Sequence, residues 1–366
     1  MLLTKERPVG LPTRDAYFTS SDMARYLPVF LMDIVRMRVT GVRYALFRFV
    51  LWFLETGIKL FLRPRSAKSV GTLSPDEVMA VYDDQARRYD GTHHLTTRGQ
   101  DLQWRREAAS YAAMVARGRQ DDLSVLDLCT GTGLTIQAMH DAFSQYGLHA
   151  HVVGLDLNQK MLDFAHRENG SNGRFMVDYV RGDATDMVGT PHGGLMKFAE
   201  ESFDVVTQVF GIGGIPDPRS VFENVIRLLK ADGRFWLCDI HHPVPAFAGE
   251  MPLFLRWIRT PAFEWVAYRT VTIPVALKQL WAWRDPTSDF YFLPLVIHQD
   301  HERQWWGFEV DQFHIESQRW WLSFPVMPTA KLAVRKVKIS PMEAAKRYKM
   351  TMQVEHHFDQ HPVVSK

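Results

Sequence analysis

Short apolar runs alternate with stretches of helical periodicity between residues 124 and 238, and this alternation constrains the fold most strongly. The apolar runs are 124–129, 151–155, 175–180, 203–209 and 234–238. Each connection except the one between the third and fourth runs carries apolar residues at helical spacing, for example Ile136, Met139 and Phe143. Continuous apolar strands separated by helices are typical of a parallel sheet covered on both faces. The pattern therefore predicts an α/β domain with a doubly wound, mostly parallel sheet.

The chain divides into four parts. Residues 1–70 are basic and apolar and are predicted to form a helical extension, and residues 74–240 form the α/β domain. Residues 241–330 are rich in aromatic side chains and lack a clean periodicity. A strand-like run resumes at residue 331, so that 331–366 are expected to supply the end of the sheet and a tail.

Charge and cysteine content exclude several classes of protein. The net charge of +2 and the lack of basic runs interleaved with aromatics argue against a nucleic-acid partner. The two cysteines, Cys129 and Cys238, lie in apolar runs and are expected to be buried free thiols. Their number excludes a disulfide framework and a cysteine-based zinc site, and no metal site is expected. The first twenty residues lack the apolar core of a secretory signal, which favours a cytoplasmic location.

The N-terminal extension has the composition of a membrane-surface helix. Nine cationic and three anionic side chains fall within residues 22–68. Within residues 44–62 the only charges are Arg48, Glu55 and Lys59, which lie within about 40° of one another on a helix. Three charges disfavour a membrane-spanning helix, whereas an interfacial helix fits. The alternative is that this helix packs against its own protein or a second copy, giving a homo-oligomer.

A glycine turn follows the first apolar run. Asp127 lies in the run, and Thr130, Gly131 and Gly133 follow it. Glycines at this point let the backbone turn tightly and approach a ligand before the next helix begins. Ile136 occupies the place of the third glycine of a dinucleotide-binding loop, and no Gly-Lys-Ser/Thr follows as in a phosphate loop. An acid before the turn suits a ligand with a positively charged amino group better than a pyrophosphate.

Acidic residues also stand at the ends of the second and third runs. Asp156 is expected to accept ribose hydroxyls, although a helix-capping aspartate is the alternative. Asp183 is placed to accept a hydrogen bond from an adenine amino group, and Met161 to pack on the adenine face or, alternatively, in the core. Carboxyl ends of parallel strands meet at one edge, so these acids predict one site. The predicted cofactor-binding set also includes Leu157, Ala184 and Gln208.

Residues 74–240 resemble the class I S-adenosylmethionine-dependent methyltransferases. The glycine turn, Asp156, Asp183 and the turn at 229–233 are similar to that superfamily's successive motifs. The resemblance implies a seven-stranded Rossmann-like sheet, S-adenosylmethionine as the cofactor, and an enzyme that transfers its methyl group.

Within that superfamily the chain resembles the ubiquinone/menaquinone-biosynthesis C-methyltransferases. The residues that carry this likeness are 82–83, 86–90 and 104–106. The resemblance implies that Tyr89 contacts the cofactor carboxylate and that this N-terminal segment lies over the cofactor.

Methyl transfer from a sulfonium requires alignment, and it requires a base only when the nucleophile must lose a proton, as a phenol or hydroquinone does. Asp239, His241 and His242 follow the fifth run at the rim of the predicted site and are the candidate catalytic residues. His93 and His94 are second candidates by resemblance. The alternative is that such histidines are structural or simply exposed.

The aromatic segment bears on the acceptor. Eight of the eleven tryptophans fall within residues 241–330. They are interpreted either as a cap over a large apolar substrate or as a second small core. With the N-terminal helix, they favour a hydrophobic acceptor such as a prenylated quinol, a phenol or another lipid-like molecule at a membrane. Alternatives are a methyltransferase for a soluble small molecule or a lipid amine, and a non-catalytic cofactor-binding scaffold.

Overall fold

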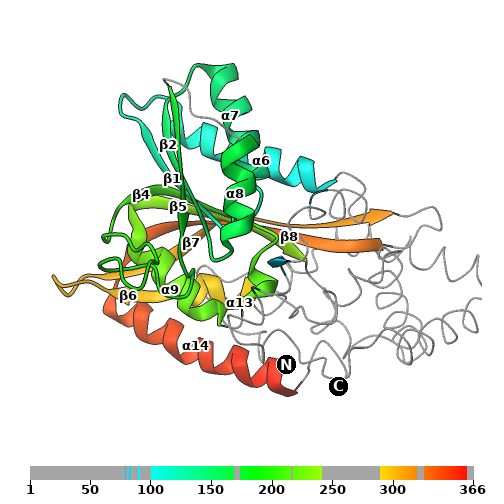
Figure 1. The fold of residues 1–366 in the computed structure, drawn as a ribbon. Helices are drawn as coiled ribbons and strands as arrows, with labels where there is room; N and C mark the ends of the chain where they lie inside the picture. Colours follow the sequence, from blue (N-terminus) through cyan, green and yellow to red (C-terminus); the bar gives the residue numbers. More distant parts are fainter. Residues whose placement is uncertain are drawn as a thin grey trace, which may run out of the picture.

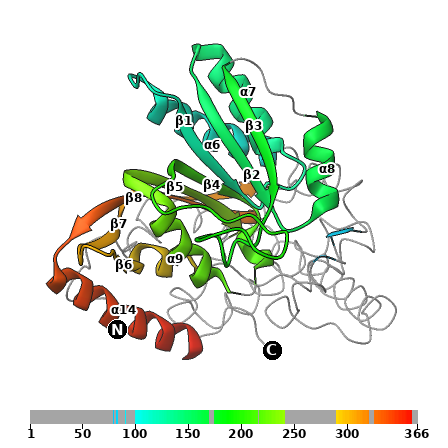
Figure 2. The same cartoon turned by 60° about the vertical axis from the view of Figure 1, so that its left-hand side comes forward.

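The computed structural model describes residues 100–168, 174–215, 217–240, 289–319 and 325–360, together with Met79, Tyr82, Asp83 and Asp90. These residues build an eight-stranded sheet with helices on both faces (Figures 1 and 2). The strand order is β3-β2-β1-β4-β5-β8-β7-β6. None of the helices in the described part of the chain is long and apolar enough to span a membrane.

The first five strands form the parallel half of the sheet, as predicted. The elements in chain order are α6 (Gln100–Ala116), β1 (Leu123–Leu128), α7 (Leu134–Tyr146), β2 (Ala150–Asp156), α8 (Gln159–Glu168), β3 (Phe175–Arg181), β4 (Phe203–Val209), the short η2 helix (Ile212–Gly214), α9 (Pro218–Leu228) and β5 (Leu229–Ile240). The connection from β3 to β4, which lacks helical periodicity, contains no helix. All five predicted strands are confirmed.

The second half of the sheet is antiparallel. Its elements are α13 (Asp289–Phe292), η4 (Leu293–Leu295), β6 (Ile297–Gln299), β7 (Trp305–Arg319), β8 (Pro325–Ile339) and α14 (Pro341–Gln360). Strand β8 pairs with β5, β7 with β8, and β6 with β7. Short edge strand β6 brings the number of strands to eight, where the resemblance implied seven.

The antiparallel half of the sheet begins earlier in the sequence than the predicted boundary at residue 331. Residues 297–330 include β6, β7 and the first part of β8, so this portion of the predicted aromatic cap belongs to the sheet. The period of two is broken in β7 because register shifts occur between Val310 and Gln312 and between Glu316 and Gln318. A bulge moves the following side chains to the opposite face, so the sequence of β7 does not alternate regularly between apolar and polar residues.

The two faces of the sheet carry separate cores. On one face, Ala112 of α6 and Phe143 of α7 pack with Val125 of β1 and other buried apolar residues. On the other, Phe222 and Val225 of α9 belong to a cluster that continues to α13 and the antiparallel strands. Figures 1 and 2 show α6 and α7 on one face and α9 and α14 on the other. This double cover leaves the carboxyl ends of β1–β4 as the place for a ligand.

Candidate functional site

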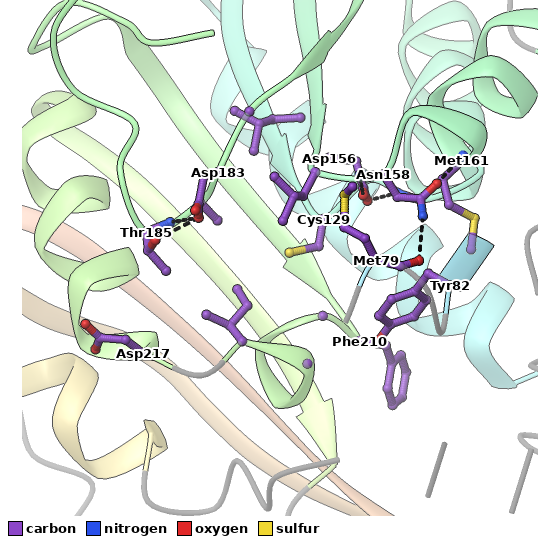
Figure 3. Close-up of a pocket in the computed structure, with 18 residues that line it drawn as sticks. Met79, Tyr82, Cys129, Asp156, Asn158, Met161, Asp183, Thr185, Phe210 and Asp217 are labelled. Atoms are coloured by element: carbon purple, nitrogen blue, oxygen red, sulfur yellow. Dashed lines mark hydrogen bonds between the residues drawn. The ribbon is translucent and has the colours of Figure 1, made fainter. Parts of the chain in front are cut away.

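A cavity of about 270 Å³ lies at the carboxyl ends of the parallel strands (Figure 3). The turn after β1 contributes Gly131, the end of β2 and the residues after it contribute Asp156 and Asn158, and the loop after β3 contributes Asp183. Residues of the η2 region and of the N-terminal segment, including Tyr82, complete the lining. The acids at the ends of β2 and β3 therefore share one cavity, as the sequence predicted.

Asp156 binds the glycine turn and faces the cavity. The backbone N–H of Gly131 donates to its Oδ2 atom at 2.9 Å, and the N–H of Asn158 donates to Oδ1 at 2.9 Å. Burial raises the pKa of the Asp156 carboxyl, and these amide donors oppose that effect. The helix cap that was the alternative role for Asp156 belongs instead to Asn158, whose Oδ1 accepts from the Met161 N–H at 3.0 Å. The remaining lone pairs of the carboxylate are free to accept hydroxyl donors from a ligand.

Asp183 stands across the cavity from Asp156, with Cys129 between them (Figure 3). Its Oδ1 atom accepts hydrogen bonds from the Thr185 N–H at 2.8 Å and from the Thr185 hydroxyl at 2.7 Å. These bonds fix the carboxylate at the cavity wall. Among the predicted cofactor residues, six line the cavity: Gly131, Asp156, Leu157, Met161, Asp183 and Ala184.

Asp127 lies behind the glycine turn and does not line the cavity. Its side chain is buried, and it accepts hydrogen bonds from the hydroxyls of Thr130 at 2.7 Å and Thr207 at 2.6 Å. Burial raises the pKa of Asp127 to about 6, and the two hydroxyl donors oppose this shift. The acid therefore joins β1 to β4 beneath the turn. Thr130 is its partner there, and Gly133 begins α7 with a φ of 83°.

Gln208 and Asp239 support the η2 helix from below. With its amide oxygen toward the turn, Gln208 accepts hydrogen bonds from the N–H groups of Gly211 and Ile212. Asp239 is buried, and its Oδ2 accepts from the Ile212 N–H at 3.0 Å and more weakly from the Gly213 N–H at 3.4 Å. Neither side chain lines the cavity. Both were predicted to act on a ligand, and both instead position the backbone of a cavity wall.

Cys129 was expected to be buried in a strand, whereas it lies in the turn after β1 and lines the cavity. Its backbone adopts a positive φ of 53°. Burial, together with the nearby charge of Asp156, raises the thiol pKa well above its usual value. The thiol is therefore protonated at neutral pH and serves as a small apolar part of the wall. Cys238 is buried in β5, as predicted.

Asp83, one of the described residues that precede α6, is bound to residues beside the cavity. The Asn158 side-chain amide donates to Asp83 Oδ1 at 2.9 Å and to the Met79 carbonyl at 3.4 Å. Lys160 forms an ion pair with Asp83 Oδ2 at 2.8 Å, and the lysine hydrogen bond is the largest cause that lowers the pKa of Asp83. Next to this contact, Met79 and Tyr82 form part of the wall. Tyr82 and Asp83 belong to the residues that carry the family resemblance, but no role in the cavity was predicted for them from the sequence.

Two further contacts join residues that precede α6 to the surroundings of the cavity. The Thr132 hydroxyl donates to Asp90 Oδ1 at 2.5 Å, which ties the N-terminal segment to the glycine turn. A Cβ atom at Gly214 would lie 2.9 Å from the Tyr82 hydroxyl oxygen, so a larger residue at 214 would displace the end of this side chain. The predicted residues Tyr89, His93, His94, His241 and His242 lie outside the described residues.

The part of the chain that forms this cavity is similar to known methyltransferases. The model of the ubiE/COQ5 methyltransferase family matches residues 71–255, which include the whole lining of the cavity. A demethylmenaquinone methyltransferase of Clavibacter sepedonicus is 29% identical over 212 residues, covering 58% of this chain and 78% of that protein. One from Renibacterium salmoninarum is 32% identical over 169 residues, covering 46% and 61% respectively. The 2-phytyl-1,4-naphtoquinone methyltransferase of Synechococcus elongatus is 28% identical over 192 residues, covering 52% and 75%.

Proposed function

This chain belongs to the ubiE/COQ5 methyltransferase family, and we propose that it methylates a quinol that carries an apolar isoprenoid tail. The observation that carries the proposal is the cavity that Asp156 and Asp183 line together with the glycine turn. S-adenosylmethionine supplies a methyl group on a sulfonium, which is already activated for transfer and leaves a neutral thioether.

The lining of the cavity suits S-adenosylmethionine. We assign the free lone pairs of Asp156 to the ribose hydroxyls, because its carboxylate is held by two backbone amides and turned into the cavity. We assign Asp183 to the adenine amino group and Met161 to the adenine face. Gly131 has a φ of 57° and no side chain, so the backbone of the turn can approach the ligand closely.

The protein contributes mainly alignment to such a transfer. Holding the acceptor in line with the methyl group can lower the barrier by roughly 7–11 kcal/mol in favourable cases. The rigid wall around η2, held by Asp239 and Gln208, supports this role. We propose His241 and His242, which directly follow β5, as the groups that take the proton of a quinol hydroxyl; His93 and His94 are the second choice. Asp239 is not proposed as the base, because its carboxylate is engaged beneath η2.

The choice of acceptor rests on the relatives. Their names specify demethylmenaquinone and 2-phytyl-1,4-naphtoquinone, which are both ring systems with long apolar tails. The tryptophan-rich segment 241–288 agrees with an apolar acceptor, and we retain it as a proposed cap. We also retain residues 22–68 as a proposed contact with a membrane or with a second copy of the chain.

A direct assay tests the proposal. The protein is incubated with S-adenosylmethionine and a reduced short-chain demethylnaphthoquinol, and the product is identified by mass spectrometry. We expect one added methyl group per ring, and we expect Asp156→Asn to raise the KM for S-adenosylmethionine by about tenfold or more, since a ribose acceptor is weakened. Asp163→Asn, an exposed aspartate of α8, is the matched control. Binding of S-adenosylhomocysteine without methylation of any quinol would refute the acceptor assignment.

A further inference from the structure

Helix α14 carries the most exposed large apolar side chains in the described part of the chain. Met342 is 82% exposed, Tyr348 is 65% exposed and Met352 is 55% exposed. The other exposed large apolar residues that the structure describes lie elsewhere, at 47% to 49%: Met114, Tyr146 and Met176. At 100° per residue, the three side chains of α14 fall within an arc of about 120°. They form one face, which we call the outer face of α14.

The opposite face of α14 packs against the rest of the protein, so the outer face is the one that this packing leaves exposed. Arg347 is buried, and its guanidinium donates to the carbonyls of Pro294 at 3.0 Å and Phe308 at 2.7 Å. Its Nε atom also donates to Glu343 at 3.0 Å, and Ala344 is buried beside it. Figures 1 and 2 show α14 along the margin of the molecule, next to β6 and β7. The orientation of the helix is therefore fixed.

The charges around the outer face are positive. Lys349 is exposed beside Tyr348 and Met352, and Lys346 is half-buried one turn after Met342. Within 341–353, where the side chains of α14 are described, the only acid is Glu343, and its carboxylate is bound to Arg347. Apolar side chains with flanking lysines are typical of a surface that meets anionic lipid headgroups.

We propose that the outer face of α14 rests on an anionic membrane surface. Methionine and tyrosine insert their apolar atoms at the headgroup level, while the lysines contact lipid phosphates. The choice of a membrane over another partner rests on the proposed function, because a quinol with an isoprenoid tail resides in a bilayer. Helix α13 contacts both α14 and α9, whose preceding residue Asp217 lines the cavity. A membrane contact on α14 thus holds the catalytic domain itself at the bilayer.

Vesicle sedimentation with the full chain tests the proposal. The lipid is phosphatidylcholine, alone or with phosphatidylglycerol. We expect the wild type to bind the mixed vesicles, and the triple variant Met342→Ser/Tyr348→Ser/Met352→Ser to bind about tenfold more weakly. The control variant is Met114→Ser/Tyr146→Ser/Met176→Ser, which replaces the same residue types on other surfaces and should bind like the wild type. Lys346→Glu/Lys349→Glu should lose the preference for phosphatidylglycerol.

Two results would overturn the proposal. One is equal vesicle binding by the wild type and the triple variant, including binding by neither. The other is a wild type that forms a dimer which the triple variant does not, since a second copy would then cover the face. Methylation of a water-soluble short-chain quinol, measured on the same proteins, separates the two hypotheses. Its absence in all variants contradicts the proposed function, whereas normal turnover with unaltered vesicle binding by the triple variant contradicts only the membrane face.

Discussion

Asp127 and Asp156 lie at the ends of adjacent strands, yet their carboxylates serve different purposes. Both carboxylate oxygens of Asp127 accept hydrogen bonds from threonine hydroxyls inside the protein, whereas those of Asp156 accept from backbone amides at the cavity wall. Both carboxyl groups are deprived of water, which raises the pKa of each. The difference in role follows from direction: the Asp127 side chain points below the glycine turn, and the Asp156 side chain points into the cavity.

The raised pKa of Asp127 makes stability depend on pH. Its folded-state pKa of about 6 exceeds the ordinary value of 3.8, so the folded protein holds this proton more tightly than the unfolded chain. The contribution of the group to the unfolding free energy is therefore largest at low pH and is lost as pH rises through about 4 to 6. We expect Asp127→Asn to remove this loss. The unfolding free energy of the variant minus that of the wild type should therefore rise by about 3 kcal/mol as the pH is raised from about 4 to about 7.5.

Urea unfolding of both proteins at several pH values measures this difference. An exposed control, Asp163→Asn, should track the wild type across the range. Parallel curves for Asp127→Asn and the wild type would mean that Asp127 titrates at its ordinary pKa in the folded protein.

Gly211 is required by packing at the cavity wall. A Cβ atom there would lie 2.5 Å from the Cys129 Cβ atom and 2.6 Å from the end of the Gln208 side-chain amide. We expect Gly211→Ala to lower the unfolding free energy by about 1–3 kcal/mol through overpacking. Adding Cys129→Gly removes the first contact and also suits the positive φ of that residue, so the double variant should recover part of the loss. Additive effects in a double-mutant cycle would contradict a direct clash.

At the scale of elements, one turn of helix α8 joins the cofactor site to the N-terminal segment. Asn158 caps α8, donates its backbone N–H to Asp156, and donates its side-chain amide to Asp83. The same residue therefore contacts both a cavity acid and Asp83. The position of Asp83 and the shape of the ligand site are coupled through these bonds.

Asp83→Ala tests the closure. The Asp83–Lys160 pair is partly exposed, so its removal should cost about 1 kcal/mol or less of stability. The affinity for S-adenosylhomocysteine should fall several-fold, because Met79 and Tyr82 lose their anchor, and the dissociation rate should rise. Asp186→Ala removes a comparable ion pair, with Lys197, away from this anchor and is the control. Equal ligand affinities for the two variants would exclude Asp83 as an anchor of the cavity wall.

For the whole molecule, ligand binding should stabilise the fold as one unit, since the cavity is built from four strand ends and the N-terminal segment. S-adenosylhomocysteine at a hundredfold excess over its Kd should add about 2.7 kcal/mol to the unfolding free energy. The melting temperature should therefore rise by several degrees, as measured by calorimetry. Asp156→Asn should reduce this rise and Asp163→Asn should not. A wild type whose melting temperature is indifferent to the ligand would favour the non-catalytic scaffold.

The sequence by itself determined the parallel half of the sheet and the cofactor edge. The five apolar runs and the intervening helical spacing are local patterns, and they are clear in the sequence because the central strands β1 and β4 are buried on both faces. The same logic placed Asp156 and Asp183 at one edge. Strand β7 was not predicted from the sequence because bulges interrupt its alternation of apolar and polar residues. Helix α14 was also not predicted from the sequence, because a buried arginine rather than an apolar stripe anchors it to the sheet.

Only the tertiary structure decided which polar side chains face the ligand. Asp127, Gln208 and Asp239 carry groups suited to a cofactor, but their partners are threonine hydroxyls and backbone amides from other elements. Conversely, Asn158 and Asp83 are far apart in the sequence and meet at the mouth of the cavity. Local pattern fixes where a strand ends, because burial repeats along the chain. The direction of a side chain at that end depends on contacts made by distant segments, and those arise only when the chain is folded.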